Sequence, residues 1–176
     1  MRIIAGSIKG RRLAGPAAGD WAVRPTSDRA REALFSILSA GPQGAFLDLF
    51  AGTGAVGLEA WSRGFQPVTC VESAPRALKL LRGNCAASDV RIMVADVLRL
   101  KPDSFSGLGI VFADPPYEES ARFLEMLAPC VVHWLARDGW LVWENAAREA
   151  IAVPDGFRLM DRRKYGAAAF HFLVPS

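Results

Sequence analysis

The stretch FLDLFAGTGAVG at residues 46–57 limits the possible fold of this chain more than any other stretch does. A short apolar run leads into a loop whose Gly52, Gly54 and Gly57 form a G-x-G-x-x-G pattern, and Glu72 follows Gly52 by 20 residues. A strand that ends in such a loop and continues as a helix is typical of a doubly wound parallel sheet that binds a nucleotide cofactor. The pattern predicts where a cofactor binds and leaves its identity open.

Short apolar runs alternate with amphipathic segments along the rest of the chain. This alternation predicts a mainly parallel sheet with helices on both faces. Residues 157–173 predict an antiparallel hairpin at one edge, with its turn near Tyr165 and Gly166. We therefore expect an α/β, Rossmann-like fold with a seven-stranded sheet. The other predicted strands span 45–50, 68–72, 91–96, 109–117 and 139–145, and the predicted helices start at Thr26, Ser27 or Asp28 and span 55–63, 75–87 and 119–134.

The first 31 residues carry a concentrated positive charge. They hold seven Lys and Arg against two Asp, a local charge of +5 in a chain whose net charge is +3. Gly6 and Gly10 flank the predicted turn of a small β-hairpin, so we expect a basic N-terminal extension at 1–25 and a main domain at 26–176. The charge indicates a polyanionic partner, although a solvated basic face explains a charge count equally well.

Composition narrows the class of protein. No apolar run approaches the roughly 20 residues that a membrane helix needs. Cys70, Cys85 and Cys130 are odd in number and lack C-x-x-C spacing, which favours reduced core thiols over a zinc site or a disulfide framework. We expect a soluble, cytoplasmic protein that uses no metal and does not bind a membrane.

Four acidic residues stand at or near the ends of successive predicted strands: Asp48, Glu72, Asp96 and Asp114. The carboxyl ends of parallel strands form the edge at which such sheets bind ligands, whereas helix capping accounts for only one or two of the four acids. Asp48 would repel the pyrophosphate of NAD but attract the sulfonium and ammonium groups of S-adenosyl-L-methionine. At about 4 Å this difference is on the order of a few kcal/mol in a partly screened site. We therefore expect S-adenosyl-L-methionine, with Glu72 on its ribose and Asp96 on its adenine amino group.

The DPPY sequence at residues 114–117 predicts the reaction. Pro115 and Pro116 have no backbone N–H, so this part of the backbone offers no hydrogen-bond donor. Its carbonyl oxygens and the Asp114 carboxylate remain as acceptors for the two hydrogens of a planar NH2 group. Accepting both hydrogens directs the lone pair of the nitrogen toward a methyl donor. Tyr117 can stack on the ring that carries the amine, which contributes roughly 1–3 kcal/mol per base. These four residues are the catalytic candidates, and a turn without a ligand is the alternative.

The motifs DLFAGTGAVGLEA, VE at 71–72 and FADPPY resemble those of amino-methyltransferases that modify exocyclic or amide nitrogens. Together with RIIAGSIKGRRL and RPTSDRAREALFSIL, they make the chain similar to the bacterial 16S ribosomal RNA guanine-N2 methyltransferases over residues 2–144. The resemblance implies methyl transfer to the N2 of one guanine in 16S rRNA. We also expect a monomer that acts on an assembling small ribosomal subunit, although naked rRNA stays open as the substrate. A paired guanine cannot present its amine to the cleft, so the target base must be unpaired or flipped out.

The resemblance also implies roles for individual residues. Arg24 and Thr26 are expected beside the methionine end of the cofactor or the incoming base, although helix entry and capping explain them equally well. Lys9, Arg11 and Arg12 are the candidates for contacts with RNA phosphates. The implied cofactor-binding residues are Asp48, Gly52, Thr53, Gly54, Glu72, Ser73, Asp96 and Val97.

Two other functions stay open from the sequence. Enzymes that methylate DNA adenine N6 or protein glutamine N5 share the DPPY chemistry, although the short basic extension argues against a chain that selects a duplex DNA site by itself. An NAD-dependent oxidoreductase or an inert nucleotide-binding module would contain the same glycine pattern. Binding of S-adenosyl-L-methionine in preference to NAD separates this last class from the methyltransferases.

Overall fold

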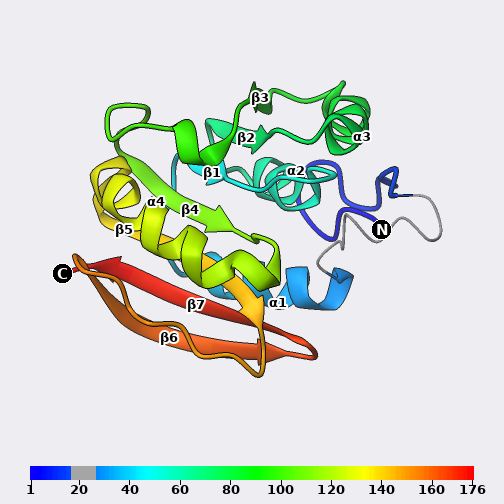
Figure 1. Cartoon of the computed structure of the whole chain (residues 1–176). Helices are drawn as coiled ribbons and strands as arrows, with labels where there is room; N and C mark the ends of the chain where they lie inside the picture. Colours follow the sequence, from blue (N-terminus) through cyan, green and yellow to red (C-terminus); the bar gives the residue numbers. More distant parts are fainter. Residues whose placement is uncertain (17–26) are drawn as a thin grey trace.

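Seven strands form one sheet in the computed structural model, which describes residues 1–16 and 27–176 (Figure 1). The strand order is β3-β2-β1-β4-β5-β7-β6; β1 to β5 pair in parallel, and β7 is antiparallel to both β5 and β6. The predicted parallel sheet with an antiparallel edge hairpin is confirmed. The strands are β1 (Phe46–Asp48), β2 (Val68–Glu72), β3 (Arg91–Val94), β4 (Leu108–Ala113), β5 (Leu135–Ala146), β6 (Phe157–Tyr165) and β7 (Ala168–Pro175).

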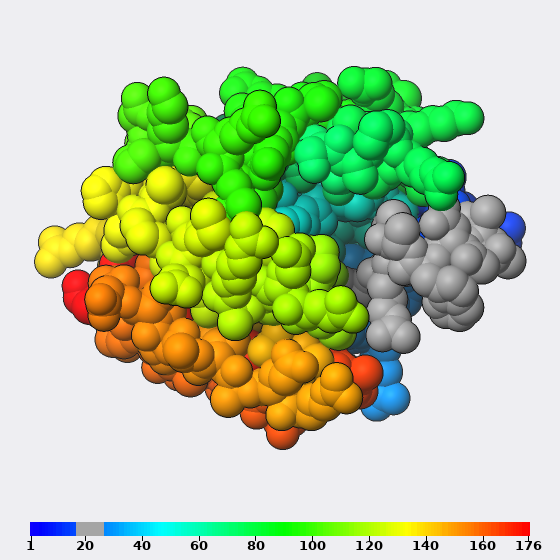
Figure 2. Space-filling model, in the orientation of Figure 1, coloured from blue at the N-terminus to red at the C-terminus, as the bar shows by residue number. Residues whose placement is uncertain are grey.

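Helices cover both faces of the sheet. The first three helices pack on one face, in a core cluster that contains Phe35, Phe46 and Leu81. The fourth packs on the other face, in a second cluster that contains Leu47 and Trp134, and Figure 2 shows it across the middle of that face. The helices are α1 (Asp28–Leu38), α2 (Ala55–Ser62), α3 (Pro75–Cys85) and α4 (Ser120–Trp134), with two short 3-10 helices, η1 (Val97–Arg99) and η2 (Tyr117–Glu119).

The order of the strands reverses at β1, which lies between β2 and β4. The connection after β1 runs through α2 and the connection after β4 runs through α4, and these two helices lie on opposite faces. Open α/β sheets bind their ligands at such a reversal, beyond the carboxyl ends of the strands. The fold therefore places the glycine loop, which follows β1, at the expected binding edge.

The side chain of Ser27 begins the first helix. Its hydroxyl accepts a hydrogen bond from the amide of Ala30 at 3.2 Å, so Ser27 is the N-cap of α1. After α2, Gly64 has a φ of +97°, the left-handed conformation that a helix-ending glycine adopts. Both predicted helix boundaries are confirmed.

The segment of residues 1–16 forms a loop that is closed by a single β-bridge between Arg2 and Arg12. The amide of Ile3 donates to the carbonyl oxygen of Arg11 at 3.0 Å, and Gly6 and Gly10 both have a φ of +86°. The predicted hairpin is thus reduced to one bridged pair with glycine turns. The reason is that several of its amides donate to α2, which leaves them unavailable for a second strand.

Neither a membrane span nor a disulfide is found in residues 1–16 and 27–176. No helix there is long and apolar enough to cross a bilayer. All three cysteines are free thiols; Cys70 and Cys85 are buried, as predicted for core thiols, and Cys130 is half-buried.

Candidate active site at the carboxyl edge of the sheet

The three glycines of the loop serve two different purposes. Gly52 and Gly54 have φ values of +55° and +80°, in the left-handed region where a side chain is strained. Gly57 lies inside α2, where a Cβ atom would come within 2.3 Å of the Sγ of Cys70 on β2. The first two glycines therefore shape the loop, and the third allows α2 to pack closely on the sheet.

Glu72 holds the glycine loop in place. One of its carboxylate oxygens, Oε2, accepts a hydrogen bond from the amide of Gly52 at 2.8 Å. The other, Oε1, accepts from the amides of Ser73 and Ala74, both at 2.8 Å. The predicted ribose contact stays a prediction, and the structure adds a second task, which is to join the end of β2 to the loop that follows β1.

Asp48 is a buried carboxylate that is only half satisfied. Its Oδ2 accepts from the amide of Gly57 at 3.2 Å, and its Oδ1 has no hydrogen-bond partner in the described part of the chain. Burial raises the pKa of Asp48 to about 8, and the charges of Asp114 and Glu72 add to the shift. An unpartnered buried carboxylate oxygen favours a ligand that brings a cation or a hydrogen-bond donor to it.

Carboxylates also stand at or near the ends of the two strands that follow β1 in the sheet, β4 and β5. We call Asp48, Asp114 and Glu144 the acid row. Asp114 directly follows β4, and Glu144 lies near the end of β5. In the sheet register Ala113 pairs with Trp143, so Asp114 and Glu144 are neighbours. Side chains two apart on a strand face the same side, and the residues two before Asp48, Asp114 and Glu144 all belong to the cluster with α1 and α2 (Phe46, Phe112 and Val142).

Asp114 holds its proton more tightly than an ordinary aspartate does. Burial raises the pKa of Asp114 well above its usual value, and the charge of Glu144 raises it further. The side chain of Asp114 is half-buried, whereas Glu144 is only 2% exposed. Asp114 is therefore the member of the pair that an incoming substrate reaches first.

Tyr117 lies beside this pair. Its hydroxyl donates to Oε1 of Glu144 at 3.5 Å, and its side chain is half-buried at the start of η2. Pro115 is buried and Pro116 is exposed, and the carbonyl oxygen of Pro116 accepts from the amide of Glu119 at 3.0 Å. The structure thus groups the DPPY residues with Glu144 at one edge of the sheet, and their catalytic roles stay predictions.

The remaining predicted cofactor residues have structural partners of their own. Asp96 accepts from the amide of Leu98 at 3.0 Å and caps η1, as the alternative interpretation of this acid held. Val97 is buried in the cluster with α4. The hydroxyl of Thr53 lies 3.8 Å from the Sδ of Met1, so its side chain faces the N-terminal segment.

The predicted RNA-binding residues do not share one environment. Lys9 and Arg12 are exposed, whereas Arg11 donates through its Nη2 to the carbonyl oxygen of Asn84 on α3 at 2.9 Å. Arg24 and Thr26 lie outside the described residues.

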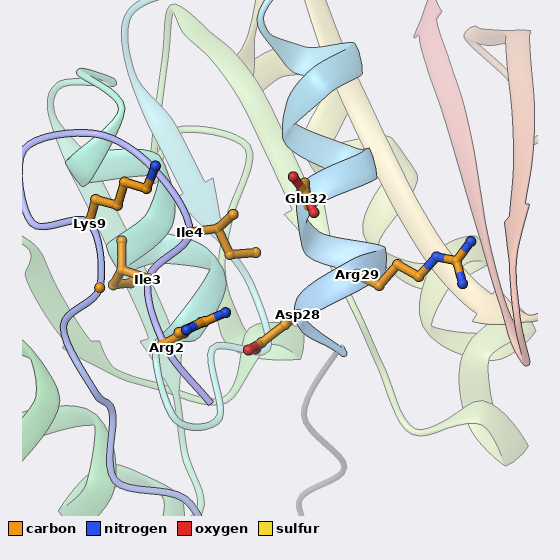
Figure 3. Close-up of a pocket in the computed structure, with 8 residues that line it drawn as sticks. Arg2, Ile3, Ile4, Lys9, Asp28, Arg29 and Glu32 are labelled. Atoms are coloured by element: carbon orange, nitrogen blue, oxygen red, sulfur yellow. The ribbon is translucent and has the colours of Figure 1, made fainter.

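A groove of about 420 Å³ separates residues 1–16 from α1 (Figure 3). Ile4 points into it, Arg2 and Asp28 lie close together at one side, and Arg29 points away from the N-terminal segment. Its lining thus mixes both charges with apolar side chains: Arg2, Ile3, Ile4, Lys9, Gly10, Asp28, Arg29 and Glu32.

A buried carboxylate on α2, Glu59, anchors the N-terminal segment. It accepts from the amides of Ile4 at 2.8 Å and Ala5 at 3.0 Å, and it pairs with Arg63 at 2.8 Å and with the buried Arg31 at 3.7 Å. Neither Glu59 nor Glu144 is among the site residues predicted from the sequence. No local pattern predicts the anchoring role of Glu59, because the two amides that donate to it are 54 and 55 residues away in sequence.

Within the described ranges, no group of three His, Cys, Asp or Glu side chains is arranged to hold a metal ion. The acid row is thus a line of carboxylates along the sheet edge and not a cage.

Comparison with known proteins places this geometry in a family. Residues 1–174 match the family model described as Conserved hypothetical protein 95. The chain is also 32% identical over 180 residues to Ribosomal RNA small subunit methyltransferase D of Escherichia coli (strain K12), across 97% of this chain and 87% of that protein. The chain belongs to the family of Ribosomal RNA small subunit methyltransferase D.

Two further relatives extend the comparison. The Ribosomal RNA small subunit methyltransferase D of Haemophilus influenzae is 28% identical over 178 residues, across 97% of this chain and 91% of that protein. The solved structure of a hypothetical protein of Thermus thermophilus is 30% identical and superposes with a TM-score of 0.82, across 100% of this chain and 99% of that one. Membership of the methyltransferase D family confirms the resemblance that the motifs predicted.

Proposed function

We propose that this chain transfers a methyl group from S-adenosyl-L-methionine to the exocyclic N2 of a guanine in 16S rRNA. The observation that carries the proposal is the acid row at the switch point, where Asp48 and Asp114 stand beside the glycine loop on one face of the sheet. The names of the relatives support rRNA as the substrate. The choice of guanine N2 rests on the DPPY sequence and the N-terminal motifs.

The residues present fit S-adenosyl-L-methionine better than NAD. Asp48 has a buried oxygen without a partner, and a cationic ligand lowers the cost of ionising it. Gly52 and Gly54 hold the left-handed backbone conformations that bend the loop next to Asp48. A pyrophosphate in the same place would face three carboxyl groups, Asp48, Glu72 and Asp114, none of which offsets its negative charge, so its binding is less favourable than that of a cation.

The chain's own residues then position and deprotonate the target amine. When it is bound, S-adenosyl-L-methionine supplies a methyl group on a sulfonium sulfur, which keeps the electron pair of the broken S–C bond. Asp114 accepts a hydrogen of the amino group and so orients the nitrogen lone pair toward the methyl carbon. The new N–C bond makes the nitrogen cationic and acidic, and its extra proton passes to the Asp114 carboxylate or to water. Tyr117 stacks on the base and excludes water from one side.

The exposed cations of residues 1–16 supply the RNA surface. Arg2, Lys9 and Arg12 are exposed on the loop that the Glu59 anchor holds against α2. Each phosphate contact releases counterions, so binding through these residues must weaken as salt rises. We expect a cytoplasmic monomer that acts on an assembling small subunit.

The test is a methylation assay on small subunits and on naked 16S rRNA from a strain that lacks the corresponding gene. Labelled S-adenosyl-L-methionine supplies the methyl group, and mass spectrometry of the nucleosides identifies the product. We expect N2-methylguanosine at one position. Label in N6-methyladenosine, in protein glutamine or in no product would contradict the proposal, and calorimetry that shows NAD binding without S-adenosyl-L-methionine binding would replace it with an oxidoreductase.

A further inference from the structure

Glu144 is a buried carboxylate to which the proposed function gives no task. It lies on β5 next to Asp114, and its backbone partner on the other side is Phe170 of β7. Its side chain is 2% exposed, and its Oε1 is 3.5 Å from the hydroxyl of Tyr117. Burying a second carboxylate beside the first is costly, because like charges at short range repel strongly in a site with little water. Two carboxylates that stand side by side on neighbouring strands can together accept two hydrogen bonds from one ligand that carries two adjacent donors.

The strand order shows which part of a substrate reaches Glu144. Glu72, Asp48, Asp114 and Glu144 stand on β2, β1, β4 and β5, which are four successive strands of the sheet. The glycine loop and Glu72 place the cofactor over β2 and β1. An amine that attacks a methyl group there must lie near Asp114, and the ring that carries the amine must then extend over β4 and β5, on the side away from the cofactor.

Guanine presents two kinds of donor on this edge. Its N2 amino group and its N1–H are adjacent and point in the same direction, whereas in adenine and in 2-aminopurine N1 is an acceptor. An ionised carboxylate accepts hydrogen bonds and cannot donate them. Two neighbouring carboxylates therefore match the two donors of guanine and repel the acceptor at N1 of adenine or 2-aminopurine. Resting on the proposed function, we propose that Glu144 accepts the N1–H of the target guanine while Asp114 accepts an N2–H, so that Glu144 specifies guanine.

Tyr117 allows a simpler role for Glu144 to be tested at the same time. If Glu144 only held the Tyr117 hydroxyl, removal of that hydroxyl would have the same effect as removal of the carboxylate charge. If Glu144 reads N1–H, the two changes differ. Glu144→Gln replaces an acceptor with a group that can also donate to an acceptor at N1, whereas Tyr117→Phe leaves the carboxylate in place.

The experiment compares two RNA fragments that carry either guanine or 2-aminopurine at the position methylated by the wild-type protein. Both bases have the N2 amine, and they differ at N1–H and at the C6 oxygen. Since the analogue also differs in electron density at N2, the readout is the ratio of the two kcat/KM values and its change between variants. The variants are Glu144→Gln, Tyr117→Phe and, as a matched loss of one nearby carboxylate, Glu118→Gln, whose side chain is exposed on η2. Calorimetry with S-adenosyl-L-methionine checks that each variant is folded.

We expect the wild-type protein to prefer guanine by about 100-fold or more, because a site built around a substrate N–H rejects an analogue that lacks it. Glu144→Gln should narrow that ratio by about 10-fold or more, and Tyr117→Phe and Glu118→Gln should keep it. A wild-type preference below about 3-fold, or an unchanged ratio in Glu144→Gln, would overturn the inference. If Glu144→Gln fails to fold, Glu144→Asp takes its place, because it keeps the charge but shortens the reach of the carboxylate, and it should narrow the same ratio. Failure of the wild-type protein to methylate any guanine would instead refute the proposed function.

Discussion

Oε2 of Glu72 lies 2.8 Å from the amide nitrogen of Gly52 and accepts its hydrogen bond. The acid at the end of β2 is thereby tied to the first glycine after β1, and its other oxygen takes the amides of Ser73 and Ala74. One carboxylate holds two connections at the edge where the cofactor is proposed to bind. Loss of its charge must therefore disturb the loop as well as any ribose contact.

Glu72→Gln should weaken S-adenosyl-L-methionine binding by about 10-fold or more and reduce the free energy of unfolding by about 1–3 kcal/mol. The physical reason is that three backbone amides donate to this carboxylate, and an amide NH2 cannot replace an acceptor oxygen. Calorimetry measures the first effect and urea denaturation the second. Asp89→Asn, which changes an exposed acid before β3, is the control and should leave both unchanged. Unaltered cofactor affinity in Glu72→Gln would remove the predicted ribose role.

Binding of S-adenosyl-L-methionine near pH 7 should release up to about one proton. The pKa of Asp48 is raised to about 8, so the free protein holds it mostly protonated at pH 7, and a cationic ligand lowers that pKa. Calorimetry in buffers with different ionisation enthalpies measures the number of protons released. Asp48→Asn should abolish the release. Proton uptake in the wild-type protein would contradict this assignment.

Asp48 should also make the ligand-free protein less stable as the pH rises. Its folded-state pKa is above the unfolded value of 3.8, so its protonated form stabilises the fold at low pH and this contribution is lost between about pH 4 and pH 8. Asp48→Asn should therefore be more stable than the wild-type protein at pH 8, with the difference shrinking toward pH 5. Thermal denaturation at both values tests the sign.

Asp114→Asn should lower kcat by about 100-fold or more and leave S-adenosyl-L-methionine affinity within about 3-fold. The carboxylate must be ionised to accept from the amine, and burial and Glu144 raise its pKa. Activity should therefore rise with pH through that pKa, and Glu144→Gln should move the rising limb to lower pH because it removes a like charge. A pH profile of kcat/KM between about pH 5 and pH 9 shows the rising limb of the wild-type protein and that of Glu144→Gln. If the rising limb of Glu144→Gln lies at the same pH as that of the wild-type protein, the charge of Glu144 does not influence the ionisation of Asp114.

Replacement of Lys9 and Arg12 by alanine should weaken RNA binding and reduce the slope of log affinity against log salt by about 2. Both side chains are exposed on the N-terminal segment, whereas Arg11 is bonded to α3 and its loss would also loosen that segment. Arg158→Ala with Lys164→Ala removes two exposed cations from β6, at the far edge of the sheet, and serves as the control. An equal loss of affinity in both double variants would show that Lys9 and Arg12 contribute only general positive charge, as residues of a solvated basic face do.

Sequence patterns predicted the fold well because the strands, helices and turns are determined largely by residues that are close together in the chain. The glycine loop, the alternation of apolar runs with helical spacing, and the turn at Gly166, whose φ is +61°, each depend on residues close in the chain. The predicted hairpin at residues 2–13 was only partly right, because its amides donate to Glu59 and Ser62 on α2, and no local pattern records such distant acceptors.

The candidate site divides in the same way. Asp48, Glu72 and Asp114 were found because each stands at the end of an apolar strand. Glu144 stands there too, in GWLVWEN, and the signal for it was the same; what the sequence could not show was that β5 lies beside β4 and brings Glu144 against Asp114. Pairing of strands is a tertiary fact, so the second carboxylate of the pair became visible only in three dimensions.

The contact of Ile4 and Ala5 with Glu59 bears on how the RNA surface could be engineered. The segment of residues 1–16 has one β-bridge and several turn hydrogen bonds of its own, and other amides of the segment donate to acceptors on α2 and α3. The arrangement of its basic side chains therefore depends on the methyltransferase core as well as on the segment itself. Grafting these residues onto another enzyme would transfer their charge without their arrangement, so the surface is not a portable module.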